Sequence, residues 1–212
     1  LITSILLIFA GMLVYLIATP RAHGESISSW VMAAFFQSVS TRTAGFNTVN
    51  IGFLPNTTLF FFVILMFIGA SPGSTGGGIK TTTFAILIRS TIATLRQEKY
   101  AHMLKYNISQ DLIAKASTVT LFALTTISLS TFFLTLFEPN INFLYLLFEE
   151  VSAFATVGLS ANLTPNLSDP SLFVLIISMY IGRVGTLTVG LAIASKALYR
   201  QQKYPNLDIP VG

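Results

Sequence analysis

One short polar segment occurs twice in this chain, each time within an apolar stretch. The first TxG segment is residues 43–47 (TAGFN), and the second TxG segment is residues 156–160 (TVGLS). An offset of 113 residues relates the two threonines and the two glycines, and the same offset relates Gly69 to Gly182 downstream. A constant offset of this kind indicates an internal repeat and predicts two structural units of one design.

Composition indicates a membrane protein. The chain has 212 residues, of which 53% are hydrophobic and 9% are charged. Soluble domains carry about 25% charged residues, and several apolar runs here approach the roughly 20 residues that cross a bilayer. We therefore predict an all-α integral membrane protein. Its net charge of +4 does not indicate nucleic acid as a partner, because the basic residues lie at helix ends. The chain has no cysteine, which excludes disulfides and cysteine metal sites.

The repeat divides the chain into four parts. Residues 1–95 form a first membrane–pore–membrane unit, and residues 111–200 form a second. Each unit contains an apolar run of membrane length, a shorter run, a TxG segment and a further apolar run. Residues 96–110 connect the units, and residues 201–212 form a polar tail. Because the connection and the C-terminal segment are rich in Lys and Arg, the positive-inside rule predicts that both are cytoplasmic.

The shorter runs, residues 28–41 and 142–155, are too short to span a membrane and predict half-helices. Ser28 or Ser29 is the expected N-cap of the first. A half-helix points its partly negative C-terminus at the TxG segment, where it favours a cation. Backbone that is not helical at membrane depth must be buried or line a wet cavity. We interpret both segments as re-entrant loops that enter from outside and bind a monovalent cation through carbonyl oxygens.

A glycine-rich run, residues 69–78, interrupts the second apolar helix of the first unit. Its one proline and five glycines end a helix, and the helical pattern resumes over residues 81–95. Discontinuous membrane helices are typical of ion and substrate pathways. A phosphate-binding loop is an alternative, but Ile79 stands where its lysine must follow directly. A flexible linker is a second alternative. The position between two apolar half-helices favours a mobile constriction.

Charged residues in the apolar runs need partners, because an isolated charge is costly at membrane depth. Arg183, in the last helix, either forms a structural salt bridge or faces the pore and meets carbonyls of the glycine-rich run. We favour the second interpretation, and we interpret Lys80 as a snorkelling residue. Glu149 and Glu150 lie in the second half-helix, and Arg42 is one candidate partner for them.

The start of the chain and its polar residues add two expectations. The chain begins with Leu1 and its first apolar run lacks a basic n-region, so we interpret it as a fragment rather than as a signal peptide. No nucleophile, base and orienting group occur together, and no metal-ligand cluster is evident. We therefore expect no enzymatic activity.

Four stretches resemble the potassium-transporter superfamily of TrkH and KtrB: residues 40–47 (STRTAGFN), 69–81 (GASPGSTGGGIKT), 155–160 (ATVGLS) and 182–188 (GRVGTLT). The glycine-rich run is the most specific of them. The resemblance covers nearly the whole chain but about half of the family's protein, whose members carry four membrane–pore–membrane repeats around one pore. The chain resembles repeats three and four, and its short connection and tail resemble KtrB more than TrkH.

This resemblance implies potassium uptake across the plasma membrane by a multi-pass protein. It implies filter carbonyls at Thr43, Ala44, Gly45, Phe46, Thr156, Val157, Gly158 and Leu159. It implies an intramembrane gate formed by Gly69, Ser71, Pro72, Gly73, Ser74, Thr75, Gly76, Gly77, Gly78 and Arg183. The sequence departs from a symmetric filter, because Ala44 stands where the second unit has Val157.

The resemblance also implies partners and ions. It implies a homodimer on a KtrA-like cytosolic ring of nucleotide-binding RCK subunits, which would face the connection and the tail. K⁺ and Na⁺ are the implied transported or coupling ions, as in a symport, with no other cofactor. Because repeats one and two are absent, the chain supplies half a filter and needs the missing N-terminal half, or a second copy, to conduct. The alternative is a membrane anchor that docks a regulatory complex without a pore of its own.

Overall fold

The computed structural model describes most of the chain up to residue 185, namely residues 2–21, 24, 26–74, 76–98, 100–103 and 106–185. Three parts of the predictions therefore lie outside the described residues. These are Thr75 of the predicted gate, the end of the predicted second unit (residues 186–200) and the tail (residues 201–212).

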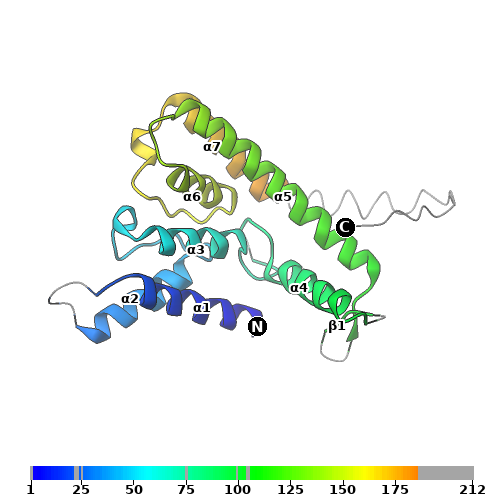
Figure 1. Ribbon diagram of the computed structural model, residues 1–212. Coiled ribbons are helices and arrows are strands. Elements are labelled where there is room, and N and C mark those ends of the chain that lie inside the picture. The colour runs from blue at the N-terminus through cyan, green and yellow to red at the C-terminus, as the bar shows by residue number, and fades with distance from the viewer. Residues whose placement is uncertain are drawn as a thin grey trace.

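The described chain is mostly helical, as predicted (Figure 1). The α-helices are α1 (Ile2–Ala18), α2 (Ile27–Ser40), α3 (Asn56–Phe67), α4 (Thr81–Leu95), α5 (Gln110–Phe137), α6 (Phe143–Phe154) and α7 (Asp169–Tyr180). The short elements are the 3-10 turns η1 (Ile51–Phe53) and η2 (Thr164–Asn166), the π-turn η3 (Ile181–Gly185), and the strands β1 (His102–Met103) and β2 (Tyr106–Asn107).

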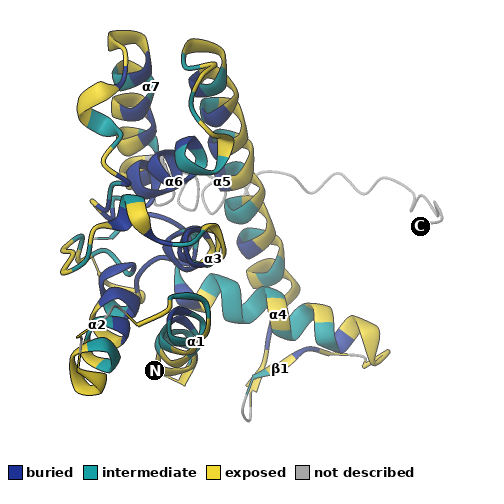
Figure 2. Cartoon of the chain, turned by 60° about the vertical axis from the view of Figure 1, so that its left-hand side comes forward, coloured by how far each residue is buried: buried dark blue, intermediate teal, exposed yellow. Residues whose placement is uncertain are grey.

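The core lies where α3 packs against α6. Phe62 and Met66 of α3 and Phe148 and Phe154 of α6 are fully buried. Figure 2 shows this region in dark blue, with α1 and α2 on one side and α5 and α7 on the other. The two halves of the chain are therefore joined through a central helix pair, and the segment that follows α6 is positioned by buried apolar side chains.

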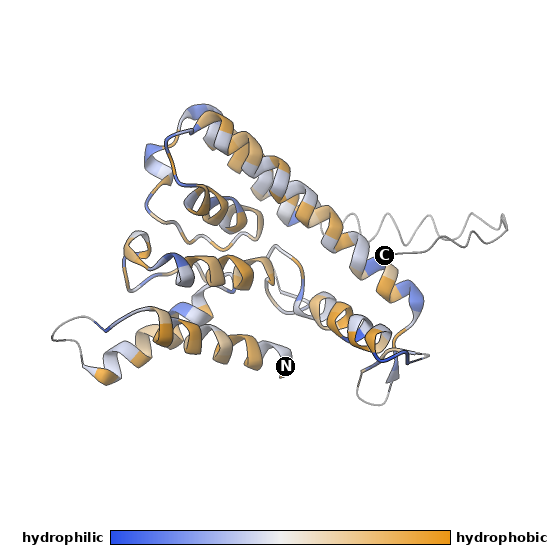
Figure 3. Cartoon of the chain, in the orientation of Figure 1, coloured by the Kyte–Doolittle hydropathy of each residue, from blue (hydrophilic) through white to orange (hydrophobic). Residues whose placement is uncertain are grey.

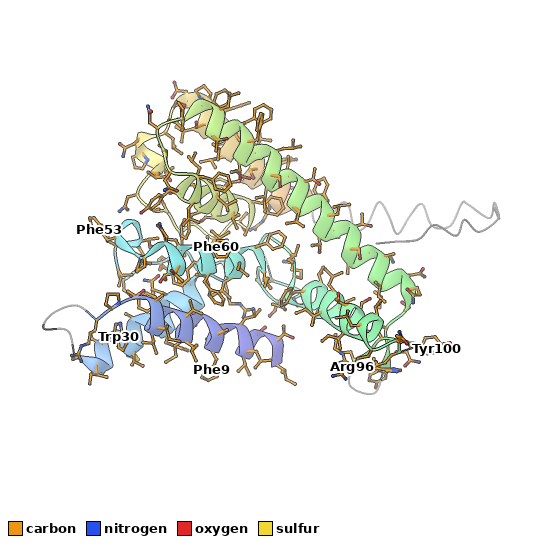
Figure 4. The ribbon with its side chains drawn as sticks, viewed as in Figure 1. Phe9, Trp30, Phe53, Phe60, Arg96 and Tyr100 are labelled. Carbon is orange, nitrogen blue, oxygen red and sulfur yellow. The ribbon has the colours of Figure 1, made fainter. Side chains whose placement is uncertain are left out.

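Apolar residues recur along the helices (Figure 3), and many large ones are exposed. Phe9 of α1 and Phe53 of η1 project outward and are 64% and 87% exposed (Figure 4). Among the described residues, α5 is the one helix that is both long and apolar enough to cross a membrane, while α1, α3 and α4 are shorter apolar helices. Exposed apolar surface on this scale marks contact with lipid or with other protein.

Side-chain caps start the two short helices. Ser26 Oγ accepts a hydrogen bond from the Ser29 N–H at 3.1 Å, so α2 begins earlier than predicted and its N-cap is neither Ser28 nor Ser29. Asn142 caps α6 in the same way, accepting from the Leu144 N–H at 2.9 Å. A run of three serines near one helix start offers several equivalent caps, and the sequence alone does not choose between them.

The predicted break in the second helix is present. We call residues 69–78, between α3 and α4, the glycine loop. Its neck is closed by backbone contacts, because Ile68 and Ile79 form a parallel bridge and the Ile79 N–H donates to the Phe67 carbonyl at 3.2 Å. The chain thus leaves α3 and returns to α4 at nearly the same place (Figure 1).

The connection between α4 and α5 contains a small hairpin that the sequence analysis did not predict. Strands β1 and β2 pair in antiparallel register, with His102 opposite Asn107. Arg89 of α4 donates through Nε to the His102 carbonyl at 2.7 Å. Arg96 and Tyr100 mark this end of the molecule in Figure 4. Strands of two residues are too short to give an alternating pattern.

Glu138 at the end of α5 holds the start of α7. Its Oε1 accepts from the Ser168 N–H at 2.7 Å and from the Ser171 hydroxyl at 2.9 Å. Hydrogen bonds from Ser168 and then Ser171 hold the pKa of Glu138 below its ordinary value of 4.5. Ser168 is the N-cap of α7, so the carboxylate also lies at the positive end of that helix.

We predict that Glu138→Gln lowers the melting temperature at neutral pH by about 2 °C, a small value because the side chain is still partly exposed to solvent. The folded-state pKa is depressed, so the contribution is present above the ordinary pKa and is lost as pH falls through the folded pKa. Melting curves from pH 7 to pH 3 test this. A difference between wild type and variant that stays constant over that range would contradict the assignment.

Candidate functional site

The two TxG segments lie against each other. They follow the C-terminal ends of α2 and α6, which belong to different halves of the chain. A Cβ atom on Gly45 would overlap the carbonyl oxygen of Val157, and one on Gly158 would lie 3.6 Å from Gly45 Cα. The glycines therefore permit a backbone-to-backbone contact that a larger residue at position 45 would block.

Both segments have the same unusual backbone at matching positions. Thr43 and Thr156 have φ values of 73° and 52°, and Gly45 and Gly158 have φ values of 75° and 92°. Left-handed backbone is an outlier for a β-branched residue such as threonine. Strain of this kind persists where surrounding structure enforces it, which is common at functional sites.

Each segment folds back on the end of its short helix. The Ala44 N–H donates to the Ser40 carbonyl at 3.2 Å, and the Val157 N–H donates to the Ser152 carbonyl at 2.9 Å. The Ser40 hydroxyl also donates to the Phe46 carbonyl. The negative ends of both helix dipoles therefore lie beside the segments, where they favour a cation.

The two segments differ in exposure. Ala44 and Phe46 of the first are exposed, with Phe46 at 72%, whereas Val157 and Leu159 of the second are 3% exposed each. The second segment is thus packed on the protein, while the first leaves one side uncovered in the described chain.

The glycine loop contacts the start of both TxG segments. The Gly77 N–H donates to the Thr156 hydroxyl at 2.9 Å. A Cβ atom on Gly76 would lie 2.7 Å from Thr43 Cγ2, and one on Gly77 would lie 2.8 Å from the Phe154 carbonyl oxygen. The consecutive glycines let this loop approach both threonines without a side chain between them.

The backbone of η3, directly after α7, also approaches α6 closely. A Cβ atom on Gly182 would overlap the Phe154 carbonyl oxygen. A Cβ atom on Gly69, its counterpart in the first unit, would likewise overlap the Gly77 carbonyl oxygen.

Among the described residues Arg42 forms no ion pair with a glutamate, so the partner predicted for Glu149 and Glu150 was wrong. Its Nη1 donates instead to the Ser4 carbonyl of α1 at 2.7 Å. Ser4 Oγ in turn lies 3.2 Å from Ser71 Oγ in the glycine loop. The arginine thus points away from the second half and anchors the first TxG segment to α1.

The two glutamates of α6 accept hydrogen bonds from neighbouring segments. Glu149 accepts from the side chains of Ser160 and Thr164, and Glu150 accepts from the hydroxyl of Ser178 on α7. Both side chains are buried, and among the described residues Glu150 Oε2 has no hydrogen-bond partner. Polar contacts of this kind hold α6 in place between its neighbours.

Lys80, rather than Arg183, bonds the carbonyls of the glycine loop in the described residues. Its Nζ donates to the Gly76 carbonyl at 2.6 Å and to the Ser74 carbonyl at 3.2 Å. The interpretation of Lys80 as a snorkelling residue did not include these bonds. Arg183 is exposed in η3 and close enough to Lys80 to interact with it electrostatically. The salt-bridge alternative for Arg183 is not observed, since the ion pair that the described residues form is Arg96–Glu98.

Comparison with known proteins decides the family. The sequence model of TrkH, described as a cation transport protein, matches residues 3–202. This chain belongs to the TrkH family of cation transport proteins. The resemblance found in the sequence is thereby confirmed, and the family is one of membrane transporters rather than enzymes.

Individual relatives are similar in sequence to this chain. Ktr system potassium uptake protein B of Vibrio alginolyticus is 39% identical over 196 residues, covering 91% of this chain and 43% of the relative. The protein of the same name from Bacillus subtilis is 40% identical over 180 residues, covering 85% and 40%. Potassium/sodium uptake protein NtpJ of Enterococcus hirae is 36% identical over 183 residues, covering 84% and 41%. The chain spans about two fifths of the length of these relatives.

The fold agrees as well. The crystal structure of the potassium transporter TrkH from Vibrio parahaemolyticus matches with a TM-score of 0.70 at 21% identity, covering 94% of this chain and 44% of that one. The helical arrangement of this TrkH-family chain is therefore that of a solved membrane transporter.

The sequence analysis missed three contacts near the candidate site. They are the Thr156–Gly77 bond, the contact of Lys80 with the glycine loop and the Ser4 anchor of Arg42. The constant offset marks Thr156 but does not reveal its partner, because the glycine-rich sequence of the loop is not repeated at the corresponding positions of the second unit. A lysine one residue beyond the glycine run, after Ile79, was the one available signal for Lys80.

We predict that Thr156→Val destabilises the protein, because it leaves the Gly77 N–H without its acceptor, at a cost of about 1–3 kcal/mol. In this chain that cost corresponds to a fall in melting temperature of roughly 2–10 °C. Thr156→Ser keeps the hydroxyl and is the matched control. Equal melting temperatures for the valine and serine variants would show that the bond contributes nothing.

Proposed function

We propose that this chain is the C-terminal half of a potassium uptake transporter of the plasma membrane, corresponding to repeats three and four. The observation that carries the proposal is the pair of TxG segments. They lie against each other, share left-handed backbone at their threonines and glycines, and follow the negative ends of two short helices. The names of the relatives support K⁺ as the ion, with Na⁺ as a second ion.

In this proposal K⁺ binds backbone carbonyls of both segments. The contributing residues are Thr43, Ala44, Gly45, Phe46, Thr156, Val157, Gly158 and Leu159. Carbonyl oxygens replace the hydration shell of the ion, and no side-chain ligand is required. Uptake follows the membrane potential, which supplies about 2.3 kcal/mol per charge per 100 mV. Two further repeats, from an N-terminal half or a second copy, complete the ring of carbonyls.

The glycine loop is the proposed gate. It consists of Gly69, Ser71, Pro72, Gly73, Ser74, Thr75, Gly76, Gly77 and Gly78, and Arg183 acts with it. The proposal is supported by the contacts of Gly76 and Gly77 with the two threonines. We add Lys80 to this gate as a latch, because it bonds two carbonyls of the loop. Lys80 and Arg183 place two positive charges beside the same loop, which opposes the passage of a cation.

The proposed assembly is a homodimer with a cytosolic KtrA-like ring of nucleotide-binding subunits. The C-terminus and the connection between α4 and α5 face the cytoplasm in this arrangement. The concentration of Lys and Arg near the connection supports that orientation.

Uptake of Rb⁺ tests the proposed function. The chain is expressed in cells that lack potassium uptake, alone and fused behind the N-terminal half of the Bacillus subtilis relative. We expect the fusion to restore uptake and Gly158→Ser to reduce it at least about tenfold, because the serine must adopt a left-handed backbone. Gly24→Ser is the control, since Gly24 has a similar φ of 85° in an open loop. A fusion that reaches the membrane but takes up no Rb⁺ would favour the alternative, a membrane anchor that docks a regulatory complex without a pore of its own.

The latch is tested separately. Lys80→Met removes both bonds to the glycine loop, so we predict Rb⁺ flux several-fold above wild type in the same fusion. Shortening the loop by two residues should act in the same direction. Lys115→Met, in the first turns of α5, controls for the loss of one positive charge. Unchanged flux in both loop variants would remove the gate from the proposal.

A further inference from the structure

A single buried carboxylate holds the chain that leaves the second TxG segment. Glu149 is 4% exposed. Its Oε1 accepts from the Ser160 hydroxyl at 2.6 Å and from the Ala161 N–H at 2.8 Å. Its Oε2 accepts from the Thr164 hydroxyl at 2.8 Å. We call residues 160–164 the second outer arm. Three donors from one short stretch converge on one acceptor, and hydrogen bonds to a charged group are stronger than neutral ones.

The contacts continue from the second outer arm to the first half of the chain. The Asn162 N–H donates to the Ser160 hydroxyl at 3.1 Å, and Asn162 Nδ2 donates to Asn50 Oδ1 at 2.6 Å. Asn50 Oδ1 also accepts from the Gly52 N–H at 3.1 Å. Residues 48–52, the first outer arm, are therefore tied to the second through a chain of hydrogen bonds that begins at Glu149.

The first unit has no equivalent carboxylate. Counting back 113 residues from Glu149 gives Phe36, which is 39% exposed and has no acceptor in its side chain. The first outer arm is instead bonded by Gln37, whose Nε2 donates to the Thr48 hydroxyl at 3.3 Å. This bond is neutral and longer. The charged clamp therefore belongs to the second unit, and the first unit is tied to it through Asn50.

Glu149 also lies next to the residues of the second TxG segment. It lines a cavity of about 400 Å³ together with Thr156, Gly158, Ser160 and Thr164. Ser160 is both the last residue of the TxG segment and a donor to the carboxylate. A displacement of the second outer arm is therefore transmitted over two peptide units to Gly158.

We propose that Glu149 is a positioning residue that fixes the spacing of the carbonyls of the second TxG segment and so determines how well K⁺ is distinguished from Na⁺. This inference rests on the proposed function. The two ions differ in the carbonyl arrangement that best replaces their hydration shells. A site of this kind requires the groups that hold the ligands to be locked by further hydrogen bonds. Glu149 provides three of these bonds without contacting the ion.

Hydrogen exchange in the purified protein tests the clamp independently of transport. Glu149→Gln removes the charge, and Glu149→Ala removes all three bonds. We expect amide exchange in residues 160–164 to become at least about tenfold faster in the alanine variant, and to a lesser extent in the glutamine variant. Glu150→Gln is the matched control, because the neighbouring carboxylate bonds α7 rather than the arm. Unchanged exchange in both Glu149 variants would overturn the clamp.

The ion selectivity of uptake tests the functional consequence of the Glu149 clamp. In the fusion used for Rb⁺ uptake, Glu149→Gln should lower the ratio of Rb⁺ to Na⁺ uptake about tenfold, with membrane levels like those of Glu150→Gln. Faster exchange with an unchanged ratio would overturn the positioning role and leave a purely structural one. If wild-type fusion takes up no Rb⁺, the proposed function fails and the selectivity role with it, while the exchange result still decides whether Glu149 holds the arm.

Discussion

The candidate site depends on close contact between backbones with no side chain between them. A Cβ atom on Gly45, Gly69 or Gly182 would overlap a carbonyl oxygen that is distant in the chain or across a loop. These contacts bring the first TxG segment to the second, one side of the glycine loop to the other, and η3 to the end of α6. Glycine is the residue that leaves carbonyl groups unobstructed at such distances. The large apolar residues of α3 and α6 then supply the burial that holds the backbones together.

The two units share a design but differ in how they are held. Ala155 of the second unit stands at the position that Arg42 holds in the first. A Cβ atom added to Gly78 would lie 3.2 Å from the Ala155 methyl group, so this small side chain leaves room for Gly78. The glycine loop contacts both units, and Arg42 also anchors the first unit to α1. In the second unit Glu149 accepts hydrogen bonds from the chain that follows the TxG segment. The two units are therefore held in place by different side chains.

Sequence patterns predicted the helices and the break well, because both depend on local composition. The bounds of α4 matched, since the glycine loop ends directly before it, and the 113-residue offset identified both TxG segments before their contact was known. Contacts between residues distant in the chain were harder to predict. Arg42 was given the wrong partner and Lys80 was given none, because a long cationic side chain reaches several acceptors and the choice depends on packing. The hairpin was missed because two-residue strands carry no period.

The closed neck of the glycine loop has a mechanical consequence. Ile68 and Ile79 are paired, so the ends of α3 and α4 stay together whatever conformation the intervening residues adopt. Rearrangement of the loop is then a local opening whose free energy is well below that of unfolding either helix. Changes within the loop are therefore local, and the paired ends of α3 and α4 form its base.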